Sequence, residues 1–225
     1  MTGKKLVLSA IRREQVDRIP WVPFVGCHGG ALLGKTAEEY LKSADLIVAG
    51  VSAAIRKYHP DGIPVTFDLQ IEAEALGCKL QWGDETPPAV VSHPLAEGME
   101  VEQMKLPEMT AGRIPVVLDA ARTLCKQYPD VAIYGLITGP FTLALHLLGT
   151  DLFIRMFDND IYVHNLLRFC SDVADRMAKS YLDAGCDVIA LVDPMTSQIG
   201  PDQFRQFVKP YATDIFKKIR AQKAC

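Results

Sequence analysis

The segment Ile63-Pro64-Val65-Thr66-Phe67-Asp68-Leu69-Gln70 decides how the rest of the chain is interpreted. It predicts a short buried strand that carries one carboxylate, Asp68, at its carboxyl end. A polar run with Glu72 and Glu74 follows, and Gly77 ends it. Ligands bind at the carboxyl ends of the strands in a parallel sheet. We therefore expect the other elements to bring further functional side chains beside Asp68.

The composition is that of an ordinary globular chain. It has 225 residues, of which 49% are apolar, and this is enough for one sizeable core. The net charge is −3, so no basic field attracts nucleic acid or an anionic membrane. No apolar run approaches the roughly 18 residues of a membrane-spanning helix. The amino-terminal residues form an amphipathic segment rather than a signal peptide. We expect a cytoplasmic protein without nucleic-acid or membrane partners.

The cysteines are scattered, with no Cys-x-x-Cys pair and no short Cys/His ligand spacing. In a cytoplasmic chain such residues are reduced thiols, and most of them are small buried side chains. Cys27 differs because glycines surround it. No metal ligand is assigned within the chain. The six cysteines are Cys27, Cys78, Cys125, Cys170, Cys186 and Cys225.

Strands and helices alternate along the chain. Continuous apolar strands that alternate with helices indicate a parallel sheet covered by helices. Four strand-helix units do not close a barrel, which takes eight. Two short runs, 79–82 and 89–92, predict a separate hairpin. The predicted strands are 19–25, 63–70, 131–137 and 187–192. The predicted helices are 4–13, 36–58, 115–125, 161–184 and 201–219.

Several segments are spread over the chain: 8–12 with 16–20, Asp68 with 75–77, 139–143, and 200–201 with Phe204, Phe207 and 210–211. In these segments, and in their order along the chain, the protein resembles the uroporphyrinogen decarboxylase superfamily. This superfamily contains decarboxylases and cobalamin-dependent methyltransferases that pass a methyl group to a thiol such as coenzyme M. The resemblance implies an α/β fold of the (β/α)8 TIM-barrel family, with only the first four to five β/α units present. Residues 1–225 would then be a single domain, incomplete at its carboxyl end.

The two branches of the superfamily differ in the loop after the first strand. Decarboxylases carry arginines there that hold the carboxylates of the substrate as bidentate ion pairs. Here the loop is Gly26-Cys27-His28-Gly29-Gly30, without arginine. His146 stands where decarboxylases have a tyrosine, and Pro194 where they have a serine; only Asp68 matches their central aspartate. The resemblance is therefore to the methyltransferase branch, which the run 72–77 also fits.

This branch implies methyl transfer from a methylated corrinoid, free or on a corrinoid protein, to a small thiol. It also implies a zinc ion that lowers the thiol pKa, bound by a His-x-Cys pair and a later cysteine. Those ligands are expected beyond Cys225. The exposed edge strand and apolar face of an open sheet favour a homo-oligomer. A decarboxylase would need no cofactor.

The strand ends supply the candidate site residues, each with a structural alternative. Asp68, Asp193 and His146 are the candidate catalytic residues. The alternatives are a loop cap for Asp68, a turn or cap for Asp193, and a core histidine for His146. For Glu72 and Glu74 we favour a solvated or loop-capping pair. The candidate binding residues are Cys27, His28, Gly139 and Phe141.

Two rival functions remain open. The first is uroporphyrinogen decarboxylation itself, because the two branches share motifs. The second is a non-catalytic half-barrel that is stable only with a partner segment or as an oligomer, since an open sheet exposes an edge strand and an apolar face.

Overall fold

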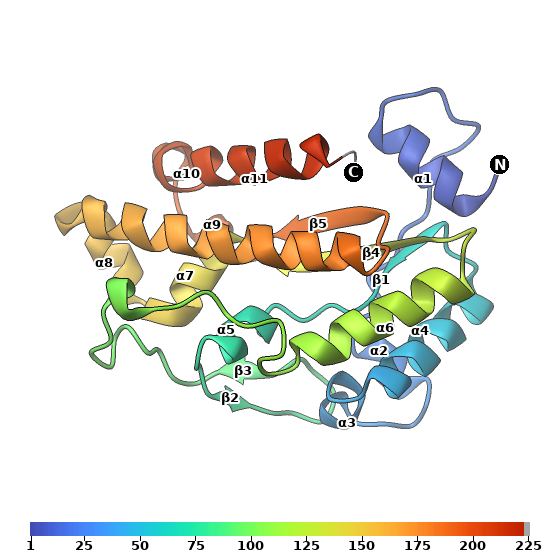
Figure 1. Cartoon of the computed structure of the whole chain (residues 1–225), viewed down its shortest axis with the longest axis horizontal. Coiled ribbons are helices and arrows are strands. Elements are labelled where there is room, and N and C mark those ends of the chain that lie inside the picture. Colours follow the sequence, from blue (N-terminus) through green and yellow to red (C-terminus); the bar gives the residue numbers. More distant parts are fainter. Residues whose placement is uncertain (223–225) are drawn as a thin grey trace.

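The computed structural model describes residues 1–222 and contains a parallel sheet flanked by helices (Figure 1). The sheet has the order β1-β4-β5, and both neighbouring pairs are parallel. The central strand β4 is buried along its whole length. An α/β fold with a parallel sheet is confirmed. The strands are β1 (Gly62–Pro64), β4 (Ala132–Thr138) and β5 (Val188–Val192).

The strands are fewer and shorter than the sequence predicts. Residues 19–25 do not pair as a strand, so that prediction is wrong. Pro20 and Pro23 have no N–H to donate to a ladder, which is the physical reason. The predicted strand 63–70 is also too long, because regular pairing of β1 ends at Pro64 and the chain then leaves the sheet.

The long helices lie side by side against the sheet (Figure 1). In space they follow the order α4, α6, α9, α11, and each packs against the next. Both α6 and α9 also contact β4. Their apolar faces form one core that includes Ile47, Leu124 and Tyr181. The bounds of these helices are α4 (Ala44–Tyr58), α6 (Ile114–Gln127), α9 (Asp160–Asp183) and α11 (Lys209–Ala221).

Two predicted helices are each divided in two. The predicted helix 36–58 begins at the expected capping box of Thr36 and Glu39, but α3 (Ala37–Leu41) ends after five residues. A second helix, α4, then begins, and the Ser43 side chain caps it by accepting the N–H of Leu46. The last one divides into α10 (Pro201–Phe207) and α11. Pro210 explains this break, because its ring and missing N–H disrupt a continuous helix.

Helix α1 (Gly3–Ile11) lies across the amino ends of the strands. The Lys4 N–H donates to the carbonyl oxygen of Asp130, just before β4, at 2.8 Å. The Lys4 ammonium pairs with Asp187, just before β5, at 2.5 Å. A Cβ at Gly3 would meet the Asp61 Cα at 2.7 Å, so glycine permits this close contact. The amino edge of the sheet is therefore closed by α1.

The other elements are short, apart from α7 and α8, which continue from β4. The hairpin is confirmed, with β2 (Leu80–Gln81) antiparallel to β3 (Ala89–Val90). Within residues 1–222, no helix combines the length and apolar content that a membrane crossing needs. The remaining elements are α2 (His28–Ala31), α5 (Ile71–Ala75), η1 (Val101–Gln103), α7 (Pro140–Leu148), α8 (Asp151–Asp158) and η2 (Pro194–Gln198).

The cysteines of the described part are free thiols, and three of them, Cys78, Cys170 and Cys186, are buried. Cys27 and Cys125 are half-buried. Cys225 lies outside the described residues.

Candidate functional site

The carboxyl edge of the sheet gathers the predicted strand-end residues. Gly139 directly follows β4, Asp193 directly follows β5, and Asp68 lies in the loop after β1. Because the strands are parallel, all three lie at the same edge.

Asp68 is the centre of a buried polar cluster. Its side chain is fully buried, and one oxygen, Oδ2, accepts a hydrogen bond from Arg113 Nη1. The other oxygen, Oδ1, accepts the Gln70 N–H at 2.9 Å. Arg113 Nε also donates to Glu74 Oε2 at 2.7 Å. The guanidinium lies over the Trp82 ring, 4.7 Å from its centroid. Asp68 is thus a charged group that Arg113 pairs and orients.

Arg113 is a residue that sequence reasoning missed. It directly precedes α6 and its side chain is only 6% exposed. An arginine beside a helix start is usually solvated, so no local pattern marks it as buried. Only the fold places it beside Asp68 and beside Glu74 of α5.

Glu72 is not solvated, so that half of the interpretation is wrong; it accepts a backbone N–H instead, as the capping alternative expects. Only 1% of the Glu72 surface is exposed to solvent. Glu72 Oε1 accepts the Thr138 N–H at 2.9 Å, and Oε2 lies 2.7 Å from Thr138 Oγ1. Thr138 Oγ1 also lies 2.9 Å from the carbonyl oxygen of Leu69. Burial raises the pKa of Glu72; the bonds from Thr138 oppose this shift and the charge of Asp68 adds to it.

Asp193 holds the start of α7. Its carboxylate accepts the N–H of Phe141 at 3.2 Å and the N–H of Thr142 at 2.7 Å. The Thr142 hydroxyl donates to it as well, at 2.6 Å. Burial raises the pKa of Asp193, while these bonds favour its charged form. Asp193, at the end of β5, therefore caps α7, the helix that follows the neighbouring strand β4.

Gly139 and Phe141 frame the same helix start. A Cβ at Gly139 would lie 2.3 Å from Asp193 Cβ, so only glycine leaves room for this carboxylate. The Phe141 side chain is fully buried and packs near Phe153, with ring centroids 6.3 Å apart. Its backbone, rather than its ring, therefore faces the strand end. A ligand-binding role for the two residues stays a prediction.

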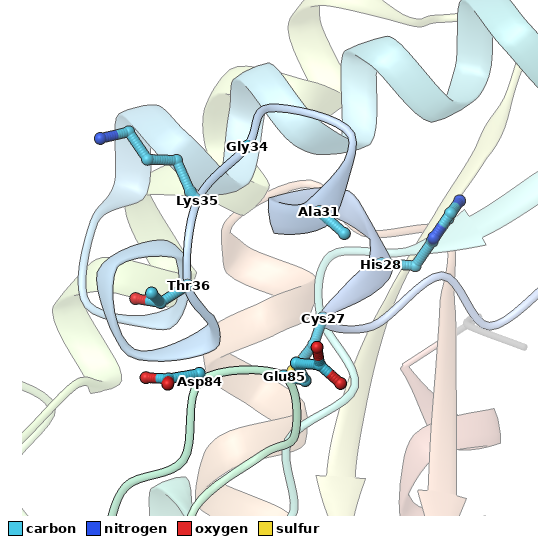
Figure 2. A pocket seen from close by; sticks show the side chains of 8 residues that line it. All are labelled: Cys27, His28, Ala31, Gly34, Lys35, Thr36, Asp84 and Glu85. Carbon is cyan, nitrogen blue, oxygen red and sulfur yellow. The ribbon is translucent and has the colours of Figure 1, made fainter.

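Cys27 and His28 lie at the start of the α2 turn, beside a pocket of about 540 Å³ (Figure 2). Their side chains point in different directions from this turn (Figure 2). The His28 Nε2 contacts Tyr58 Oη at 2.7 Å. Burial raises the pKa of the Cys27 thiol to about 11, and the nearby Asp68 charge adds to this. The fold thus brings Cys27 near Asp68, whereas His28 pairs with α4. The pocket is lined by Cys27, His28, Ala31, Gly34, Lys35, Thr36, Asp84 and Glu85.

His146 lies in the last turn of α7, at the far end from Gly139. Its residue is 8% exposed, and its Nδ1 has no hydrogen-bond partner within the described residues. Burial lowers the pKa of His146 to about 4, and His93 adds to this, although the Asp68 charge acts in the opposite direction. His146 is therefore a neutral imidazole at neutral pH.

The described residues do not fit a zinc site. Among residues 1–222, no group of three or more His, Cys, Asp or Glu side chains lies close enough to hold a metal ion.

Comparison with known proteins places this geometry in a family. The family model described as uroporphyrinogen decarboxylase (URO-D) matches residues 2–224. The methylcobamide:CoM methyltransferase MtbA of Methanosarcina acetivorans is 31% identical over 95% of this chain and 65% of its own length. A methylated-thiol–coenzyme M methyltransferase of Methanosarcina mazei is 33% identical over 97% of this chain and 61% of its own length.

A solved structure, a methyltransferase from Methanosarcina mazei, superposes with a TM-score of 0.90 at 26% identity. The superposition covers 97% of this chain and 67% of that one. The chain thus spans about two thirds of the length of the proteins it matches. With a family match across nearly its whole length, the chain belongs to the uroporphyrinogen decarboxylase (URO-D) family.

Proposed function

We propose that the chain is the part of a methyltransferase that carries the Asp68 cluster, in an enzyme that moves a methyl group from a methylated corrinoid to a small thiol. The observation that carries this is the similarity to relatives named as methylcobamide:CoM and methylated-thiol–coenzyme M methyltransferases. The substrates, and a corrinoid protein as partner, are proposed on the same ground.

The composition and packing of the loop 26–30 support methyl transfer rather than decarboxylation as the function. The loop 26–30 has no arginine to hold a substrate with many carboxylates. It forms the α2 turn against Tyr40, and a Cβ at Gly29 would lie 2.5 Å from Tyr40 Oη. A longer side chain at Gly29 therefore has no space without rearrangement.

The reaction itself needs orientation more than proton transfer. The thiolate sulfur forms a bond to the methyl carbon while the carbon–cobalt bond breaks, and the electron pair of that bond stays on cobalt. Asp68, held by Arg113 and Gln70, offers a fixed carboxylate at the edge where the substrates would meet. His146 is neutral and adds no charge. Residues 1–222 contain no group of His, Cys, Asp or Glu side chains that could bind zinc.

Incubation of the protein with methylcobalamin and coenzyme M tests the proposed activity. We expect a methylated thiol together with loss of the methylcobalamin absorbance. Asp68→Asn should lower the rate roughly 10- to 100-fold, as loss of an orienting group does. Asp61→Asn is the matched control, because it makes the same change at the opposite end of β1 and should keep the rate when folded. A full-length protein, as long as the relatives, that neither binds zinc nor demethylates methylcobalamin with any thiol contradicts the proposal.

Uroporphyrinogen decarboxylation is the alternative function, and a parallel assay with uroporphyrinogen tests it. The family name motivates it, and the arginine-free loop speaks against it. We expect no loss of carboxyl groups when the protein is mixed with uroporphyrinogen. Decarboxylation at a rate that Asp68→Asn abolishes would replace methyl transfer as the function.

Association with a further segment or a second copy is also part of the proposal. Trp21 and Phe24 are about half exposed, although Phe24 packs edge-on against Phe67 and Tyr134. Such open aromatic surface favours contact with another surface. Sedimentation measures this directly, and a stable monomer at high concentration would exclude a stable homo-oligomer.

A further inference from the structure

The Thr138 hydroxyl at the end of β4 has more acceptors beside it than protons to give. Its Oγ1 lies 2.7 Å from Glu72 Oε2 and 2.9 Å from the Leu69 carbonyl oxygen. A hydroxyl group carries one proton, and a carbonyl oxygen can only accept. If the hydroxyl donates to Leu69, the proton of the short contact with Glu72 must come from Glu72.

A protonated Glu72 satisfies every polar atom in this contact. Its acid proton is donated to Thr138 Oγ1, whose own proton goes to the Leu69 carbonyl oxygen. The other carboxyl oxygen accepts the Thr138 N–H at 2.9 Å. An ionised Glu72 would compete with Leu69 for the single hydroxyl proton and would leave one buried acceptor without a donor, which is costly.

The charges nearby favour the same state. Arg113 bonds to Asp68 and Glu74 but not to Glu72, so among residues 1–222 no cation pairs with Glu72. Complete burial penalises its charged form, and the negative charge of Asp68 adds to that penalty. The titratable groups on the elements packed around Glu72 are Asp68, Glu74, Arg113, His146 and Tyr181.

We propose that Glu72 is a neutral carboxylic acid in the folded protein at neutral pH and acts as a positioning residue for Asp68. Its proton completes a hydrogen-bond chain from α5 through Thr138 of β4 to Leu69, the residue directly after Asp68. These hydrogen bonds hold the Asp68 loop against the sheet while Arg113 remains paired with Asp68. The protonation state stands by itself, whereas the positioning role rests on the proposed function.

Infrared difference spectroscopy of the wild-type protein reads the protonation state directly. We expect a carbonyl stretching band of a protonated carboxyl group in the folded protein at neutral pH. The band should disappear on unfolding in denaturant at the same pH, because an exposed glutamate ionises. Folded wild-type protein without this band overturns the inference.

Variants assign the band to one residue. Glu72→Gln should lose it, and Glu74→Gln, a matched change next to the same cluster, should keep it. A band that survives in a folded Glu72→Gln variant overturns the assignment. Should Glu72→Gln fail to fold, Thr138→Val removes the acceptor of the acid proton and should move the band to higher frequency; an unmoved band counts against the proposed bond.

The pH dependence of stability gives a second readout. A glutamate whose folded pKa is raised contributes its stability below its ordinary pKa of 4.5, and this is lost as the pH rises through the folded pKa. The amide in Glu72→Gln keeps both bonds to Thr138 and cannot ionise. We therefore expect the melting temperature of wild type to fall relative to this variant as the pH rises. Parallel curves would overturn the inference.

The positioning role has its own readout in the methyl-transfer assay. The wild-type rate should fall at alkaline pH as Glu72 ionises, and Glu72→Gln should remove this limb of the profile. An unchanged limb in the folded variant overturns the role. An infrared band that behaves as expected, in a protein without methyl transfer, would contradict the proposed function but not the protonated state.

Discussion

The two edges of the sheet pair their acidic groups in different ways. At the amino edge, Asp61 pairs with Arg18 at 2.6 Å, and the Arg18 side chain is 60% exposed. At the carboxyl edge, Asp68 pairs with Arg113, whose side chain is 6% exposed. The two aspartates flank the same short strand, β1. Both aspartates are buried, so the two ion pairs differ mainly in how exposed the arginine is.

The difference indicates which edge is built to hold charge away from water. Exposed ion pairs contribute little to stability because water and salt screen them. A buried pair that loses one partner leaves an unpaired charge in a poorly solvated place. The carboxyl edge thus keeps a fixed, desolvated carboxylate, which suits a binding or catalytic site, whereas the amino edge fastens α1 and its following loop.

The largest effect is expected when the buried pair is broken. Arg113→Met leaves Asp68 buried without its cation and should lower the free energy of unfolding by about 3–5 kcal/mol. Urea denaturation measures it. A loss below about 1 kcal/mol would mean that Asp68 is solvated or finds another partner, and the contrast between the edges would disappear.

An acid-dependent loss of stability is expected from His146, on the helix that starts at the carboxyl edge. Its folded pKa, about 4, lies below the ordinary 6.5. The unfolded chain therefore binds a proton first as the pH falls, so this contribution is present above pH 6.5 and is lost toward pH 4. The shift corresponds to roughly 3 kcal/mol.

Thermal unfolding across that pH range, for wild type and His146→Leu, measures the contribution. The variant lacks the titrating group, so its curve should be flatter. Equal slopes in the two proteins would show that folding does not lower the pKa of His146.

A smaller effect is expected from the cap of α7. Asp193→Ala removes the acceptor of the Phe141 and Thr142 N–H groups and should lower the free energy of unfolding by about 1–2 kcal/mol. Thr142→Val, which removes only the hydroxyl donor, should have less effect. If the two variants were equally stable, the backbone bonds to Asp193 would contribute little.

The smallest effect is expected from Arg18→Met at the amino edge. The Arg18 bond lowers the pKa of Asp61, so the pair stabilises the fold above the ordinary pKa of 3.8, and this is lost as the pH falls. High salt should weaken the pair in wild type. A loss as large as that of Arg113→Met would contradict the comparison of the two edges.

Local patterns predicted the long helices and several helix starts, but not the shorter helices α2, α5, α7 and α8. The capping box at Thr36 and the proline that opens α6 both mark real helix starts. The same patterns predicted a strand over residues 19–25, where apolar content suited a strand but the prolines prevented pairing. Apolar periodicity reports burial, and burial alone does not ensure a hydrogen-bonded ladder.

The candidate site was predicted only in part. Asp68, Gly139 and Asp193 were expected at one edge, because parallel strands must end together, and they lie there. The partners of these residues were not expected. Arg113 reaches Asp68 across 45 positions of sequence and Glu72 reaches Thr138 across 66, and no local spacing encodes such contacts.

The amino-acid sequence by itself determined the α/β class, the family and the edge at which the candidate site residues gather, because periodicity, turn residues and motifs act over short distances along the chain. Only the tertiary structure decided the state of each carboxyl group. Asp193 caps α7, the helix that follows the neighbouring strand, and Asp68 pairs with a buried arginine, whereas Glu72 has no arginine partner among residues 1–222. The free energy of a charge depends on the water, dipoles and charges around it, and folding brings these together from distant parts of the chain.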